Sequence, residues 1–109
     1  MARSNEAGMW NLVMFDLPVI TKEQRREATR FRLLLINLGW QRAQLSVYVR
    51  YVPTGMSVVR EVSLMRAQLP LEGRVEVVAI TDRQWSKAIR FLNHRELEKN
   101  EAPALLTLF

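Results

Sequence analysis

Apolar residues dominate the stretch from Met9 to Phe15, which ends at the carboxylate of Asp16 and is followed by Pro18. A nearly continuous apolar run of this length is typical of a central β-strand that is covered on at least one face. The run therefore predicts a strand over 9–16, with Asp16 at its carboxyl end.

Helical periodicity begins shortly after this strand. Thr21 and Gln24 have the spacing of a capping box, in which two side chains satisfy free N–H groups at the start of a helix. Gly39 supplies a C-terminal stop. The apolar positions at helical spacing are Ala28, Phe31, Leu35 and Leu38. The pattern predicts an amphipathic helix over 22–38.

The segment 40–52 predicts either two strands or one long bent strand, with a turn near Gln44 and Ser46. Its second part alternates with a period of two, which is typical of a half-exposed strand. One face carries Val47, Val49 and Tyr51, and the other carries Ser46, Tyr48 and Arg50.

Three further elements follow. A second helix is expected between the break at Pro53–Gly55 and Pro70, and β-branched residues predict a strand over 75–80. Thr81 and Gln84 repeat the capping-box spacing and predict a short third helix. The apolar positions are Val58, Val62, Met65 and Leu69 in the second helix, and Trp85, Ala88, Ile89 and Leu92 in the third.

The order of elements predicts an α+β fold of the ferredoxin-like type, βαββαβ, with an appended C-terminal helix and terminal strand. We expect a polar N-terminal tail over 1–8 and a ferredoxin-like domain over 9–92. A charged segment and a partner-pairing strand are expected over 93–109. The apolar residues 104–109 are predicted to pair with another surface.

Two helices on one face leave the other face of the predicted sheet uncovered. In a small chain, packing two sheets together in a homodimer buries that face economically. Tyr48 and Val52 are the residues expected to face the partner.

Composition narrows the class of protein. A length of 109 residues with 49% hydrophobic content fits one small domain. The absence of cysteine excludes disulfides and thiolate metal sites and suits a reducing cytoplasm. His94 is expected at the surface, and no apolar run approaches the roughly 18 residues of a membrane helix. We expect a soluble cytoplasmic protein with no membrane partner.

Charge points to a polyanionic partner. The formal net charge is +5, and arginine greatly outnumbers lysine. The planar guanidinium suits bidentate phosphate contacts, so nucleic acid is the first expectation and an acidic protein surface the second. A solvated helix face crossed by Glu/Arg pairs is the alternative explanation of the charges in the first helix.

Several separate motifs, in this order, resemble the small CRISPR-associated adaptation protein, a dimeric nuclease family that accompanies the CRISPR integrase. The similarity extends from Met9 to Leu92 and is greatest to members from Cas9-containing loci. The motifs that carry it are Val13-Met14-Phe15-Asp16-Leu17-Pro18, Glu23-Gln24-Arg25-Arg26-Glu27, Arg30-Phe31-Arg32, Gly39-Trp40, Gln44-Leu45-Ser46-Val47-Tyr48-Val49-Arg50 and Thr81-Asp82-Arg83-Gln84-Trp85.

The resemblance implies a function and a site. Asp16 matches the proposed metal ligand of the family, so it is the candidate catalytic residue and the candidate ligand of Mg²⁺. The family dimer bridges integrase dimers and holds a prespacer DNA duplex during spacer acquisition, and it is a possible Mg²⁺-dependent endonuclease. The candidate nucleic-acid-binding residues are Arg25, Arg26, Arg30, Arg32, Arg42 and Arg50. Because no second carboxylate stands beside Asp16 in the sequence, a mainly structural role is expected.

Two other classes remain open. Ferredoxin-like domains include RNA-binding modules, which stack bases on aromatic side chains of the open sheet face. A toxin-like endoribonuclease or a plain dimeric interaction domain is the other class. Whether RNA or DNA is the cleavage substrate is not decided by the sequence.

Overall fold

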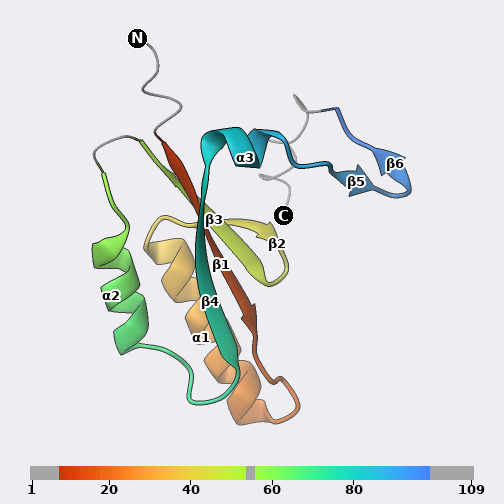
Figure 1. Cartoon of the computed structure of the whole chain (residues 1–109). Coiled ribbons are helices and arrows are strands. Elements are labelled where there is room, and N and C mark those ends of the chain that lie inside the picture. The colour runs from red at the N-terminus through yellow and green to blue at the C-terminus, as the bar shows by residue number, and fades with distance from the viewer. Residues whose placement is uncertain (1–7, 54–55, 99–109) are drawn as a thin grey trace.

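The structure is a computed structural model that describes residues 8–53 and 56–98 (Figure 1). The elements of the main body are β1 (Met9–Asp16), α1 (Lys22–Asn37), β2 (Gln41–Gln44), β3 (Val47–Val52), α2 (Val59–Ala67) and β4 (Arg74–Thr81). They are followed by α3 (Asp82–Ser86), β5 (Phe91–Leu92) and β6 (Arg95–Glu96). This order confirms the predicted α+β, ferredoxin-like arrangement.

Four strands form one antiparallel sheet in the order β2-β3-β1-β4. The central strand β1 pairs on one side with β3, where Val13 lies opposite Tyr48. On its other side β1 pairs with β4 along its whole length, from Met9 opposite Thr81 to Asp16 opposite Arg74. The predicted break between two strands near Gln44 is confirmed by the turn between β2 and β3.

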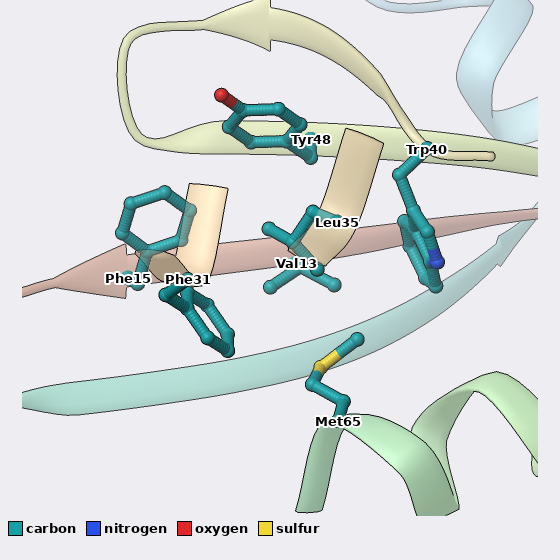
Figure 2. Close-up of a cluster of buried hydrophobic side chains, with 7 residues drawn as sticks. All are labelled: Val13, Phe15, Phe31, Leu35, Trp40, Tyr48 and Met65. Carbon is teal, nitrogen blue, oxygen red and sulfur yellow. The ribbon is translucent and has the colours of Figure 1, made fainter. Parts of the chain in front are cut away.

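Both helices of the main body pack on the same face of this sheet. α1 begins at the predicted capping box, in which Thr21 and Gln24 each accept a hydrogen bond from the other's backbone N–H. Side chains from α1, α2 and the sheet meet in one core (Figure 2): Val13, Phe15, Phe31, Leu35, Trp40, Tyr48 and Met65. The Phe15 ring meets Phe31 edge to face at 5.5 Å and stacks against Tyr48 at 5.8 Å. Full burial of each such side chain contributes about 1.5–3 kcal/mol.

The expectation that Tyr48 and Val52 face a partner is wrong. Tyr48 is 1% exposed and Val52 is 6% exposed, and Tyr48 belongs to the core beneath the helices. Alternation separates the two faces of a strand but does not say which face the helices cover. The opposite face of the sheet, here called the open face, carries the alternate positions Trp10, Leu12, Met14, Val47, Val49, Tyr51, Val78 and Ile80.

The third helix is shorter than predicted. α3 starts at the predicted capping box but ends at Ser86, and the chain then forms the β5–β6 hairpin. Asn93 and His94 lie at its turn with φ of 53° and 70°, a left-handed pair that suits a tight hairpin. His94 is exposed, as expected. A short apolar run fits a strand as well as a helix, which explains the error over 87–92.

A stack of aromatic rings joins α3 to the sheet at the end opposite Asp16. The Trp10 ring lies 4.5 Å from the Trp85 ring and 5.2 Å from the Tyr51 ring. The Arg90 guanidinium lies 4.6 Å from the Trp85 centroid, and the Trp10 indole N–H donates to Asp82 at 2.8 Å. These contacts hold the start of the C-terminal segment against β1.

Two predictions about the rest of the chain are not tested. The tail over 1–8, apart from Gly8, and the strand over 104–109 lie outside the described residues. Within the described part of the chain, no helix is long and apolar enough to cross a membrane.

Candidate metal and nucleic-acid site

Asp16 is the last residue of β1 and is exposed at the edge of the open face. A shallow hollow surrounds it, lined by Met14, Phe15, Asp16, Ser46, Val47, Arg74 and Glu76. The Phe15 N–H donates to the Ser46 carbonyl at 3.1 Å, which fixes the end of β1 against the turn between β2 and β3. The candidate metal ligand therefore follows a residue that is hydrogen-bonded to the turn between β2 and β3.

Gly73 sets the position of this strand end from the other side. Its φ is +97°, a conformation that glycine adopts without the steric cost of a Cβ. A Cβ there would lie 2.7 Å from the Asp16 carbonyl oxygen and 2.8 Å from Leu17 Cδ2. The backbone of Asp16 can lie this close to the turn before β4 only because residue 73 has no side chain.

Glu76 is a second carboxylate in the same hollow, and the sequence reasoning missed it. It lies opposite Met14 in the β1–β4 register, and is therefore a diagonal neighbour of Asp16 on the same face. Asp16 and Glu76 are sixty positions apart in the sequence, and only the register of β1 with β4 brings them together. Predicting that register is the signal that could have identified Glu76. Arg74 is the register partner of Asp16 and pairs with Glu76 at 3.0 Å, so its guanidinium already neutralises one of the two acids.

The donor set fits a weakly held Mg²⁺ better than a closed metal cage. Carboxylate oxygens are the ligands Mg²⁺ prefers, and it is commonly held by one or two carboxylates while it keeps several waters. Among the described residues, no group of three or more His, Cys, Asp or Glu side chains is placed to hold a metal. Within the hollow, Asp16 and Glu76 are the carboxylates that could contribute oxygen ligands.

The first turns of α1 carry a cationic surface, here called the cationic stripe, which consists of Lys22, Arg25, Arg26 and Arg30. One shallow depression is lined by Lys22, Arg25, Arg26, Thr29, Arg30 and Leu33. The Arg26 side chain is 69% exposed and forms a 3.3 Å ion pair with Glu23, which is itself exposed and therefore binds weakly. Arg25 donates to the carbonyls of Val19 and Ile20, which orients its guanidinium over the loop before α1. Lys22 is a member that the sequence reasoning missed, although it precedes Arg26 by four residues, about one helical turn.

Arg30 and Arg50 also support the fold. Arg30 pairs with Glu27 at 2.9 Å and donates to the Gln68 carbonyl at 3.0 Å, which ties α1 to the end of α2. The hydrogen bond that Arg30 donates to the Glu27 carboxylate holds the pKa of Glu27 below its ordinary value. Arg50 lies on the helix-covered face, where it donates to the Gly39 carbonyl and pairs with Glu61 of α2 at 3.5 Å. A nucleic-acid contact by Arg50 stays a prediction, and it would compete with these bonds.

Arg32 and Arg42 lie away from the cationic stripe. The Arg32 guanidinium is 5.7 Å from the Phe15 centroid, and Arg42 of β2 is paired with Tyr48 of β3. The Nε atoms of both are buried without a hydrogen-bond partner among the described residues. Only their terminal nitrogens are therefore placed to contact a ligand at the surface.

Comparison with known proteins identifies the family. A family model described as CRISPR associated protein Cas2 matches residues 9–88. A Paracidovorax avenae protein named CRISPR-associated endoribonuclease Cas2 is 40% identical over 101 residues, which cover 93% of this chain and 94% of that protein. Proteins of the same name from Flavobacterium psychrophilum and Parvibaculum lavamentivorans are 32% and 33% identical. Each of these two alignments covers 93% of this chain. The first covers 88% of the Flavobacterium protein and the second covers 100% of the Parvibaculum protein. The resemblance drawn from the motifs is thereby confirmed, and the chain belongs to the CRISPR-associated Cas2 family.

Proposed function

We propose that this chain acts in CRISPR spacer acquisition as a homodimer that bridges integrase dimers and binds prespacer duplex DNA on the cationic stripe. Membership of the Cas2 family supports a role in a CRISPR system. The observation that carries the DNA-binding part is the clustering of Lys22, Arg25, Arg26 and Arg30 on one surface of α1.

The spacing of the stripe suits a phosphate backbone. Lys22, Arg26 and Arg30 follow one another at four-residue intervals, which places successive charges about 6 Å apart along the helix axis. Two base steps of B-DNA advance by about 7 Å along each strand, a similar distance. Contacts of this kind position a duplex without distinguishing sequence, as the collection of foreign DNA requires.

The test compares two double variants of equal charge. Lys22→Ala with Arg26→Ala removes two exposed cations of the stripe, whereas Arg83→Ala with Lys87→Ala removes two exposed cations at α3, near the opposite end of the sheet (Figure 1). Duplex affinity is measured against salt concentration for unrelated sequences. The stripe variant should lower the slope of log K against log salt by about 0.9 for each phosphate that is no longer neutralised, and the α3 variant should leave it unchanged. Equal effects of the two variants would reduce the stripe to a solvated helix face.

The open face supports the homodimer. At the Asp16 end it presents partly exposed apolar side chains from three strands: Leu12 and Met14 of β1, Val47 of β3 and Val78 of β4. Trp10, at the other end of this face, is covered by the Trp85 ring of α3. Burying such a patch against a second copy would bring two Asp16 residues toward one another. Light scattering at micromolar concentration should give about twice the chain mass, and a monomer would remove both the shared metal site and the bridge.

We further propose that Asp16, assisted by Glu76, holds Mg²⁺ for phosphodiester hydrolysis. When bound, the ion would generate a nucleophile from water and stabilise charge on the phosphate. Arg74 lies opposite Asp16 and can contact a phosphate oxygen if its pairing with Glu76 is exchanged. Asp16→Asn should abolish Mg²⁺-dependent cleavage and leave folding, dimerisation and duplex binding unchanged. Undiminished cleavage by that variant would remove Asp16 from the catalytic role.

RNA cleavage is the second candidate function, because the relatives from three organisms are named endoribonucleases. The same Asp16→Asn comparison is run on single-stranded RNA and on duplex DNA. Loss of RNA cleavage alone assigns the hydrolytic site to RNA. Integration that persists in the variant supports the scaffold role, and integration that fails in a folded, complex-forming variant overturns it.

A further inference from the structure

An apolar cleft lies beside the start of α1, on the far side of the strand end from the open face. It is formed where the loop after β1 meets the loop between α2 and β4 at one end of the molecule (Figure 1). Its volume is about 100 Å³, and its apolar lining consists of Leu17, Pro18, Ala28, Pro70 and Leu71. An apolar cavity of about 150 Å³ holds a benzene molecule, so this one has room for a single branched aliphatic side chain.

Apolar side chains beside the cleft are unusually exposed. Leu71 is 98% exposed, and Ile20 of the facing loop is 85% exposed. The Gln24 side chain joins the two loops, because its carbonyl accepts from the Ile20 N–H at 2.9 Å while its amide donates to Glu72 at 3.2 Å. The two loops are thus tied to one another through Gln24. Exposed apolar side chains beside an apolar cleft are typical of interaction sites.

The rim of the cleft is acidic in a protein whose net charge is +5. Glu23, Glu27 and Glu72 are among the residues that line the cleft. Glu23 and Glu27 are paired with arginines of the cationic stripe, but no cation of the described residues lies within 4.0 Å of the Glu72 carboxylate. The hydrogen bond to Glu72 comes from a neutral amide, so its charge remains available to a ligand.

We infer that this cleft docks a protein segment in which an aliphatic side chain is flanked by lysine or arginine. The aliphatic side chain fills the apolar floor, and the flanking cations meet Glu72 and Glu23 at the rim. Phosphate is disfavoured here by the carboxylates, which separates this surface from the cationic stripe one helical turn away. The two surfaces allow α1 to contact a polyanion and a basic protein partner at the same time.

The experiment titrates the full chain with a blocked pentapeptide, Gly-Arg-Leu-Arg-Gly, and follows backbone amides by ¹⁵N NMR without DNA. The amides around Ile20, Leu71 and Glu72 should shift saturably with a Kd near the millimolar range. Two matched peptides, Gly-Arg-Ala-Arg-Gly and Gly-Glu-Leu-Glu-Gly, should each bind at least about fivefold more weakly, because the first lacks the apolar anchor and the second repels the rim.

Variants localise the effect. Leu71→Ser and Glu72→Gln should each lower the affinity for the leucine-containing peptide several-fold. Glutamine at position 72 keeps an oxygen that can accept the hydrogen bond from Gln24. Leu45→Ser and Glu96→Gln change an exposed leucine and an exposed glutamate away from the cleft, and both should leave binding unchanged.

Three results would overturn the inference. One is the absence of saturation up to roughly 10 mM peptide, and another is binding that Leu71→Ser and Glu72→Gln leave intact. The third is concentration-dependent shifting of the same amides without peptide, which would make a second copy the occupant. Because no nucleic acid is present, failure here leaves the proposed DNA binding standing, and failure of DNA binding leaves the cleft standing.

Discussion

Replacing Gly73 by alanine should destabilise the domain strongly, because the added Cβ is unfavourable in two ways: through the backbone conformation and through a close contact. The left-handed backbone at φ +97° costs an alanine about 1–2 kcal/mol. The added Cβ also lies 2.7 Å from the Asp16 carbonyl oxygen, and overpacking of this kind costs about 1–3 kcal/mol. The sum is about 2–5 kcal/mol out of the roughly 5–15 kcal/mol that stabilises a typical domain.

Gly39→Ala is the matched control for this prediction. Gly39 has the same φ of +97°, but its new Cβ would meet the end of the flexible Arg50 side chain rather than backbone. The conformational cost is therefore shared, and the two variants differ in what must move. Gly73→Ala requires the end of β1 to shift, whereas Gly39→Ala requires a side chain to turn and weakens a half-buried ion pair with Glu61.

The assay is urea unfolding followed by tryptophan fluorescence, since Trp40 is only 2% exposed and reports loss of the core. We expect Gly73→Ala to lose about 1 kcal/mol or more beyond Gly39→Ala, and to lower Tm by at least about 10 °C. If Gly73→Ala costs no more than Gly39→Ala, the contact with the Asp16 carbonyl does not constrain the strand end, and the account of how Asp16 is positioned is wrong.

Three further predictions test separate contacts. Thr21→Ala removes the N-cap of α1 and should cost about 1 kcal/mol in urea unfolding, and a decrease below about 0.3 kcal/mol would contradict the cap. Trp85→Ala removes the ring stacked on Trp10, and hydrogen exchange of the β5–β6 hairpin should become faster while that of β1 and β3 is retained. Because its pKa is depressed in the folded state, Glu27 contributes stability above its unfolded pKa and loses it as pH falls through the lower folded pKa. An NMR titration should place the midpoint of Glu27 below the ordinary value of a glutamate carboxyl, and Arg30→Ala should return the midpoint toward that ordinary value.

The fold was largely predictable because its signals are local. The apolar run ending at Asp16 and the capping box at Thr21 placed β1 and the start of α1 at the residues where the structure has them. The two faces of β3 were also separated correctly. Alternation does not indicate which face the helices cover, however, so Tyr48 was assigned to the partner-facing side although it lies under the helices. The prediction of where α3 ends was wrong, because the apolar residues after Ser86 suit a hairpin as well as a helix.

Only the local part of the candidate site could be proposed from the sequence. Asp16 is visible at the end of its own strand, but Glu76 joins it through the pairing of β1 with β4, which no short-range pattern encodes. Lys22 could have been found from its four-residue spacing to Arg26 on α1. The structural bonds of Arg50 to Gly39 and Glu61 depend on how the helices sit on the sheet, so sequence alone left it among the candidates for nucleic-acid binding.

The central position of β1 also bears on how this chain folds during synthesis. The strand is synthesised before both of its partners, and the second partner, β4, is complete only at Thr81. Until then one edge of an apolar strand has unpaired backbone groups, a state that invites pairing with other nascent chains. The β1–β3 pair can form earlier, but closure of the sheet joins residues 58 to 72 positions apart, and such non-local pairing is slow to form. Chains truncated before β4 should therefore aggregate rather than accumulate as a smaller folded domain.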